Sequence, residues 1–148
     1  MRQRCVAAPG AGGRQGFRVS ARTAEGNDAV RRGRLAKAEQ FASTAEAVLE
    51  LADELDDITD AYTSLCVLAG IAAADAICCI RLGRYSRGED HRAAVSLLKT
   101  ADADAARHLS RLLRFKTAAG YSHVPVSAER ARAAGRAMQS LLRAATTA

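Results

Sequence analysis

The sequence predicts an all-α domain, an antiparallel four-helix bundle with one additional short helix. The 148-residue chain is rich in alanine, leucine and arginine, which are strong helix formers, and aromatic residues make up only 4% of it. Apolar residues recur at three- and four-residue spacing in several segments. Residues 61–80 contain a single charged residue, Asp75, and a helix that is apolar on nearly every side belongs in the middle of a bundle.

Residues 1–24 differ in composition from the rest of the chain. They are rich in glycine, arginine and alanine and show no periodicity, so we expect a disordered basic tail and one helical-bundle domain over residues 25–148. Their five arginines are not followed by the apolar stretch of a secretory signal. Two other interpretations stay open: a basic arm that contacts nucleic acid, and an upstream extension from a wrongly chosen start codon.

The first helix is predicted from about Asp28 to Glu54, where an apolar stripe has helical spacing. The positions of this stripe are Leu35, Ala38, Phe41, Ala45, Val48, Ala52 and Leu55. The outward face becomes acidic in its second half, and acids near a helix C-terminus oppose the helix dipole. These acids are Glu39, Glu46, Glu50, Asp53 and Glu54. We therefore expect a basic neighbour from the C-terminal half of the chain.

The second helix is predicted from about Ile58 to Leu82. Its length would also suit a membrane span, but Asp75, two hydroxyl residues and many alanines make it weakly hydrophobic. We therefore interpret it as a core helix. Gly70 and the alanines allow neighbouring helices to approach closely, and Gly83 follows as the C-cap.

Three further helices complete the prediction. A loop over residues 84–90 leads into a short helix from about Asp90 to Thr100. The next helix runs from about Asp102 to Thr117 and ends at Gly120. Ser127 is a favourable N-cap for the last helix, which carries an apolar stripe of its own.

The four cysteines do not have the spacing of a metal site or a disulfide framework. Cys78 and Cys79 are adjacent, Cys66 lies on the same apolar segment, and Cys5 stands in the tail, so no C-x-x-C pair exists. We expect reduced, apolar core thiols in a cytoplasmic protein, with no metal and no cofactor.

Charge is divided into three zones along the chain. Residues 1–37 hold nine Lys/Arg and two acids, residues 38–75 hold nine acids and no Lys or Arg, and residues 76–148 hold thirteen Lys/Arg and five acids. The net charge of +6 therefore conceals a strongly segregated pattern. We expect part of it to be neutralised within the bundle or at a dimer contact, and part to face nucleic acid.

No nucleotide-binding or hydrolase motif is present in the sequence. A Walker loop, HExxH, G-x-S-x-G and G-x-G-x-x-G are all absent. Three histidines, a buried acid and many arginines remain. A metal-independent ribonuclease needs little more, because a histidine can transfer protons near neutral pH and a cation can stabilise the charge that develops on the phosphate.

Each candidate residue has a structural alternative. Asp75 is the sharpest candidate, but a lone acid on an apolar helix is commonly tied to an arginine for stability. His91 could simply begin its helix, His123 could be a surface loop residue, and His108 could lie on a solvated face. The cations expected to contact nucleic acid are Arg84, Arg87, Arg92, Arg111, Arg114 and Lys116.

Three segments together resemble the HEPN family of small helical bundles, over roughly residues 28–145. The run Ala-Ala-Asp75-Ala-Ile-Cys-Cys-Ile-Arg81 is similar to the family's second helix with its inward acid. The run Glu89-Asp90-His91-Arg-Ala-Ala-Val-Ser-Leu-Leu98 is like its histidine-led short helix. The junction before the last helix is similar over Leu112-Leu-Arg-Phe-Lys-Thr-Ala-Ala-Gly-Tyr121 and Val126-Ser-Ala-Glu-Arg-Ala131.

The resemblance implies a dimer with a cleft that faces RNA. Active members of the family place an arginine, followed a few residues later by a histidine, at the start of the last long helical segment. Here Arg114 or Lys116 stands in place of the arginine, and Gly120-Tyr121 occupies the expected histidine position. Arg84 and His91 have the family's spacing but precede the short helix. The resemblance therefore favours binding over cleavage.

Our leading hypothesis is a cytoplasmic, HEPN-like homodimer associated with RNA, as the toxin or ribonuclease of a bacterial toxin–antitoxin or stress module. As a metal-independent endoribonuclease it would use Asp75 to orient the site, Arg114 or Lys116 to hold phosphate, and His91 or His123 to transfer protons. The alternative is a non-catalytic interaction module, the partner of a nucleotidyltransferase or antitoxin. A weaker alternative is a DNA-binding protein, for which charge is the only support.

Overall fold

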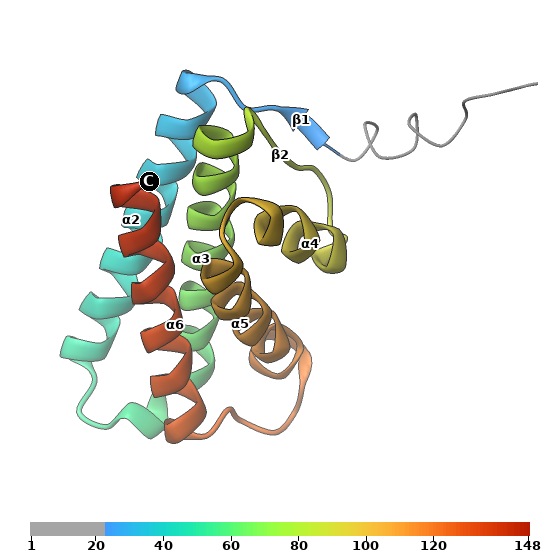
Figure 1. The fold of residues 1–148 in the computed structure, drawn as a ribbon. Helices are drawn as coiled ribbons and strands as arrows, with labels where there is room; N and C mark the ends of the chain where they lie inside the picture. Colours follow the sequence, from blue (N-terminus) through green and yellow to red (C-terminus); the bar gives the residue numbers. More distant parts are fainter. Residues whose placement is uncertain (1–22) are drawn as a thin grey trace, which may run out of the picture.

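The computed structural model describes residues 23–148, which are mostly helical (Figure 1). Their helices and strands, in chain order, are β1 (Thr23–Glu25), α2 (Asp28–Leu51), the short 3-10 helix η1 (Leu55–Asp57), α3 (Thr59–Leu82), β2 (Arg84–Ser86), α4 (His91–Ala101), α5 (Ala103–Tyr121) and α6 (Ala128–Thr147). The all-α fold class is thus confirmed in coarse terms. The tail predicted for residues 1–24 lies outside the described residues, except that Thr23 and Ala24 belong to β1.

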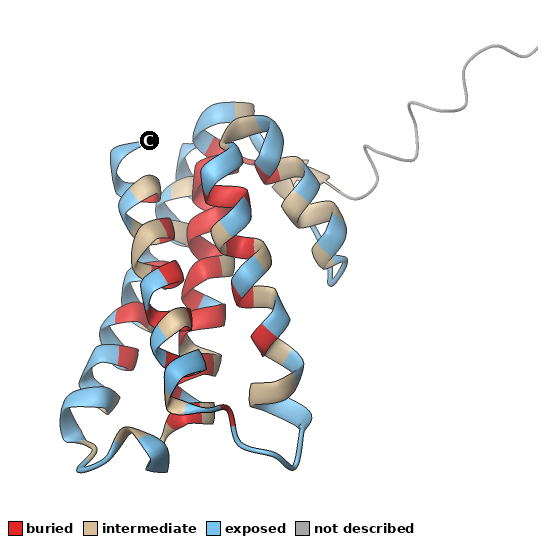
Figure 2. Cartoon of the chain, turned by 60° about the horizontal axis from the view of Figure 1, so that its bottom comes forward, coloured by how far each residue is buried: buried red, intermediate tan, exposed pale blue. Residues whose placement is uncertain are grey.

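Helix α3 lies in the middle of the molecule and packs against α2, α5 and α6, with α4 at one side (Figure 1). Figure 2 shows the buried residues gathered along this helix, while the outer faces of the other helices are exposed. Gly70 permits the close packing: a Cβ there would press on the Leu112 side chain and lie 3.2 Å from Cδ1 of Leu141. Within residues 23–148, α3 is also the one helix long and apolar enough to cross a membrane, and it is buried as a core helix would be.

The helix ends largely follow the signals in the sequence. Gly83 ends α3 in the left-handed region with φ 68°, and its N–H donates to the Cys79 carbonyl at 3.0 Å. Asp90, Asp102 and Ser127 each accept a backbone N–H as N-caps of α4, α5 and α6. These caps satisfy N–H groups that would otherwise lack a partner, so local chemistry sets these boundaries.

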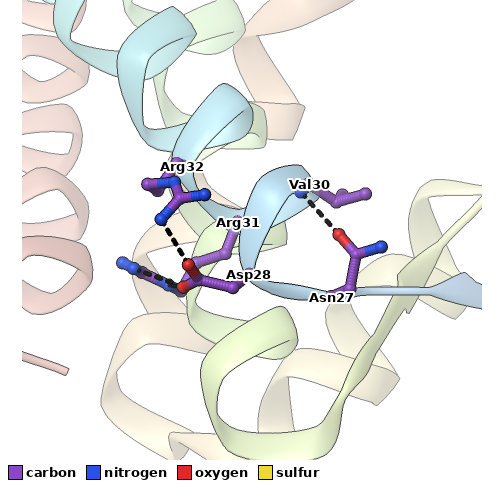
Figure 3. A network of polar contacts seen from close by, with 5 residues as sticks. All are labelled: Asn27, Asp28, Val30, Arg31 and Arg32. Atoms are coloured by element: carbon purple, nitrogen blue, oxygen red, sulfur yellow. Dashed lines mark hydrogen bonds and ion pairs between the residues drawn. The ribbon is translucent and has the colours of Figure 1, made fainter.

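The start of α2 is capped in the same way (Figure 3). The Asn27 side chain accepts from the Val30 N–H at 2.9 Å, and the Asp28 carboxylate pairs with Arg31 at 2.8 Å and with Arg32 at 2.5 Å. An acid in the first turn also favours the helix dipole. The helix therefore begins at the predicted residue.

Two helix ends differ from the prediction. Helix α2 ends at Leu51, before the predicted end at Glu54, because Ala52 takes an extended backbone with ψ 134°. Acids at that end oppose the helix dipole and give no support for a further turn. Helix α5 continues through Gly120 to Tyr121, since a glycine weakens a helix without ending it.

The short strands β1 and β2 were not expected. They pair antiparallel, with Thr23 opposite Ser86, and the Gly26 N–H donates to the Gly83 carbonyl at 2.9 Å. Gly26 lies directly against Cys79 of α3, where a side chain would collide with the thiol. This pairing ties the chain before α2 to the chain after α3, and so holds β2 beside the end of the central helix.

Helix α6, which carries four arginines, lies beside the acidic half of α2, but no ion pair joins the two helices within residues 23–148. The two helices run side by side in opposite directions (Figure 1). The Glu46 carboxylate accepts a hydrogen bond from the side-chain amide of Gln139, so these two residues lie side by side. Arginines flank Gln139 along the outer face of α6.

Candidate functional site

Two adjoining hollows lie beside α4 and share His91 and Leu113. The inner hollow, of about 380 Å³, lies between α3, α4, α5 and the segment that follows β2. Its polar side chains are Arg34, Asp75, Tyr85, Ser86, Arg87, Glu89, His91 and Lys116. The outer hollow, of about 570 Å³, lies between α4 and α5 and adds Arg92, Ser96, Ser110 and Arg114. We refer to the two together as the cleft.

Asp75 lies on the wall of the inner hollow and forms an ion pair with Arg34 of α2. The distance from the guanidinium Nη2 to the carboxylate Oδ2 is 2.7 Å, and the Asp75 side chain is only 13% exposed. Burial raises the pKa of Asp75 to about 6, while the nearby Arg34 charge acts in the opposite direction. The buried acid is therefore partnered, as one of the alternatives held.

Arg34 is a residue that the sequence reasoning missed. It lines the inner hollow, and its Nε atom is buried without a hydrogen-bond partner among the described residues. The available signal was its spacing, because Arg34 precedes Ala38 by one turn and so continues the buried stripe of α2. A cation in line with an apolar stripe indicates that an acid lies opposite.

His91 is the first residue of α4, positioned by the Asp90 cap that accepts the Ala93 N–H at 3.1 Å. Its Nε2 atom lies 2.9 Å from the Nζ atom of Lys116 on α5. In a hydrogen bond donated by the Lys116 ammonium, Nε2 is the acceptor, which assigns the ring proton to Nδ1. The cleft thus places a histidine ring nitrogen next to a cation.

Cations line both hollows around this pair. Arg87 joins Lys116 in the inner hollow, and Arg92 joins Arg114 in the outer one. The three arginines are exposed and form no ion pair within residues 23–148. Their charge is therefore available to an anion that enters the cleft.

The other predicted residues lie elsewhere. His123 is exposed in the loop between α5 and α6 and lines neither hollow. Arg84 on β2 and Arg111 on α5 are exposed outside both hollows, and His108 is half-buried on α5. Of the two histidines proposed to transfer protons, the structure brings only His91 into the same hollow as Asp75.

The described residues offer no ready metal site. No group of three or more His, Cys, Asp or Glu side chains within residues 23–148 could hold a metal ion. Cys66 and Cys78 are buried free thiols, and burial raises the pKa of each to about 12.

No protein-family model matches the chain, and no curated protein matches it.

Proposed function

We propose that this protein is a HEPN-like, RNA-binding helical bundle whose cleft holds the RNA phosphate backbone. The observation that carries the proposal is the contact between His91 and Lys116 at the junction of two hollows, which are lined by further arginines without an ion pair among residues 23–148. Arginine suits phosphate because its planar guanidinium can bind two oxygens at once. The hydroxyls of Ser96 and Ser110 in the outer hollow could bind the 2′-hydroxyl that distinguishes RNA from DNA.

The arrangement of the helices supports the HEPN-like part of the proposal. The acid of the second long helix and the histidine that begins the short helix both line the inner hollow, and these are two of the features on which the resemblance depends. Four long helices, α2, α3, α5 and α6, surround this arrangement with the short α4 at the side. We further propose that the protein acts in the cytoplasm of a bacterium, as part of a toxin–antitoxin or stress module. Its protein partner there would be an antitoxin or a nucleotidyltransferase.

A second candidate function is metal-independent cleavage of the bound RNA, favoured by the place of His91 beside Lys116 in the cleft. Once the Lys116 ammonium turns from Nε2 toward the phosphate, Nε2 would take the proton of a 2′-hydroxyl as the 2′-oxygen attacks the adjacent phosphorus. The bond from phosphorus to the 5′-oxygen would break, giving a 2′,3′-cyclic phosphate and a 5′-hydroxyl that takes up a proton. Lys116 would stabilise the charge that develops on the phosphate oxygens.

Fluorescence anisotropy with a labelled single-stranded RNA oligonucleotide tests the binding proposal. The logarithm of the binding constant falls linearly with the logarithm of the salt concentration, with a slope of about −0.7 for each phosphate that the protein neutralises on a single strand. The loss of one phosphate contact should therefore flatten this slope by about 0.7. We expect this for Lys116→Ala and for Arg114→Ala. Arg111→Ala is the matched control, because it removes the same kind of charge from α5 outside the cleft. Equal losses for all three variants would contradict binding in the cleft.

Cleavage is tested with the same oligonucleotide in the presence of a chelator. Wild-type protein should release a cyclic-phosphate product, and His91→Ala should release none while still binding RNA. An oligonucleotide with 2′-deoxyribose should remain intact. Binding without any product leaves the protein as a binding module, and expression together with its genomic neighbour would then identify a partner by co-purification.

A further inference from the structure

The ion pair between Asp75 and Arg34 lies at the wall of the inner hollow, where a ligand can reach it. Both residues line that hollow, and their side chains are 13% and 27% exposed, respectively. The guanidinium Nη2 lies 2.7 Å from the carboxylate Oδ2, while Nε is buried without a hydrogen-bond partner among the described residues. Arg34 therefore has hydrogen-bonding capacity that Asp75 does not use.

Other charged and titratable groups surround the Asp75 carboxylate. Its neighbours on α3 itself are the thiols of Cys78 and Cys79. The remaining groups come from the other elements around the hollow: Arg34 (α2), Tyr85 (β2), Arg87 and Glu89 (after β2), His91 (α4) and Lys116 (α5). The lining thus combines three cations with two acids, so it attracts an anion only weakly while both acids are ionised.

A phosphate group in this hollow would lie beside the Asp75 carboxylate. Two anions in contact at a mostly buried position strongly disfavour each other, and the cost is relieved when one of them takes up a proton. A phosphodiester is a much stronger acid than a carboxyl group, so it keeps its charge. The proton therefore goes to Asp75, where burial already favours the neutral form.

We propose that Asp75 and Arg34 form a phosphate subsite that binds the RNA backbone together with one proton. As the phosphate enters, Asp75 takes up a proton from solvent, and Arg34 exchanges the carboxylate for the phosphate oxygens. The neutral carboxyl group then donates its O–H to the phosphate. The O–H bond of Asp75 is the one covalent bond that forms. This inference rests on the proposed function, because it concerns how the same cleft binds RNA.

Proton uptake gives the RNA affinity a pH dependence of defined sign. Burial raises the pKa of Asp75 to about 6 in the free protein, so at pH 7.5 the carboxyl group is mostly ionised and binding requires a proton. The affinity should therefore rise as the pH falls from 8, by up to about tenfold per pH unit, the limit for one proton. It should level off below about pH 6, where the free carboxyl group is already neutral.

Fluorescence anisotropy between pH 5.5 and 8 tests the subsite with an oligouridine that lacks terminal phosphates, because such an RNA does not titrate in this range. Asp75→Asn has the shape of the neutral acid at every pH, and we expect it to bind throughout about as tightly as the wild type does at pH 5.5. Asp53→Asn is the matched control: Asp53 is exposed beyond the end of α2 and lines neither hollow, so the wild-type profile should persist. Circular dichroism at each pH confirms that the variants are folded.

His91 titrates in the same pH range and is separated from Asp75 by a second pair of variants. His91→Gln retains an acceptor for the Lys116 ammonium but does not take up a proton. The rise in affinity toward low pH should persist in His91→Gln and disappear in Asp75→Asn/His91→Gln. If it persists in the double variant, or disappears in His91→Gln alone, the subsite is overturned while RNA binding in the cleft stands.

NMR of the Asp75 carboxyl carbon distinguishes this inference from the proposed function. Sulfate resembles a phosphate group but does not titrate between pH 5.5 and 8. Added sulfate should raise the pKa of Asp75 relative to chloride at the same ionic strength, and Arg34→Met should reduce this response. A pKa that neither sulfate nor RNA raises would overturn the subsite. A chain that responds to sulfate but binds no RNA at any pH would support the subsite and refute the proposed function.

Discussion

The buried carboxyl group of Asp75 should make the stability of this protein depend on pH, and Asp75→Asn isolates that effect. Burial favours the neutral carboxyl and raises its pKa from 3.8 to about 6, and the ion pair with Arg34 offsets burial only in part. The folded protein therefore binds this proton more tightly than the unfolded chain does. The contribution of Asp75 to stability is fully present below pH 3.8 and is lost as the pH rises through about 6.

The magnitude follows from the shift in pKa. One pKa unit corresponds to 1.36 kcal/mol, so the shift from 3.8 to about 6 gives a loss of about 3 kcal/mol in the free energy of unfolding. Asparagine has nearly the same shape but does not ionise. We therefore expect Asp75→Asn to unfold like the wild type near pH 4, and to be more stable than the wild type at pH 7.5 by up to about that amount.

Urea unfolding, followed by circular dichroism between pH 4 and 8, measures the free energy of unfolding of the wild type and of Asp75→Asn. The useful quantity is the difference between variant and wild type at each pH, because other groups titrate equally in both. Arg34→Met is the companion variant, since it removes the partner charge and should increase the pH dependence of the wild-type carboxyl. If Asp75→Asn is instead several kcal/mol less stable at pH 7.5, the ion pair outweighs burial and the reasoning is refuted.

Two further predictions concern the core around α3. Gly70→Ala should destabilise the protein by about 1–3 kcal/mol in the same assay, because the added Cβ would collide with Leu112. Gly33→Ala is the control: it has open space around it and should stabilise α2 by about 0.5–1 kcal/mol. Equal effects of the two substitutions would show that Gly70 is not a packing residue. The buried thiols of Cys66 and Cys78, whose pKa values burial raises to about 12, should react with iodoacetamide at pH 8 only after unfolding in urea, as measured by mass spectrometry of their peptides. Rapid labelling of the native protein would show that α3 is less buried than described.

Local sequence chemistry determined much of this structure. Helix starts at Asp102 and Ser127 and the helix end at Gly83 could be predicted because each is set by hydrogen bonds within a few residues. The central place of α3 could be predicted from composition, since a helix apolar on nearly every side has to be enclosed. Asp75 stood out as a candidate for the same reason: it is the single charge in an apolar run.

Only the tertiary structure decided which residues share the cleft. The spacing of Arg34 places it on the buried stripe of α2, but only the packing of α2 against α3 brings it to Asp75. His91 meets Lys116 across a sequence separation that no local pattern encodes. The packing of the helices also left His123 outside the cleft. In the same way, the sequence showed that acids and arginines are segregated, but the antiparallel packing of α2 and α6 set them side by side on one face. Long side chains reach partners that helix packing brings near, so such contacts follow from the packing of the whole fold.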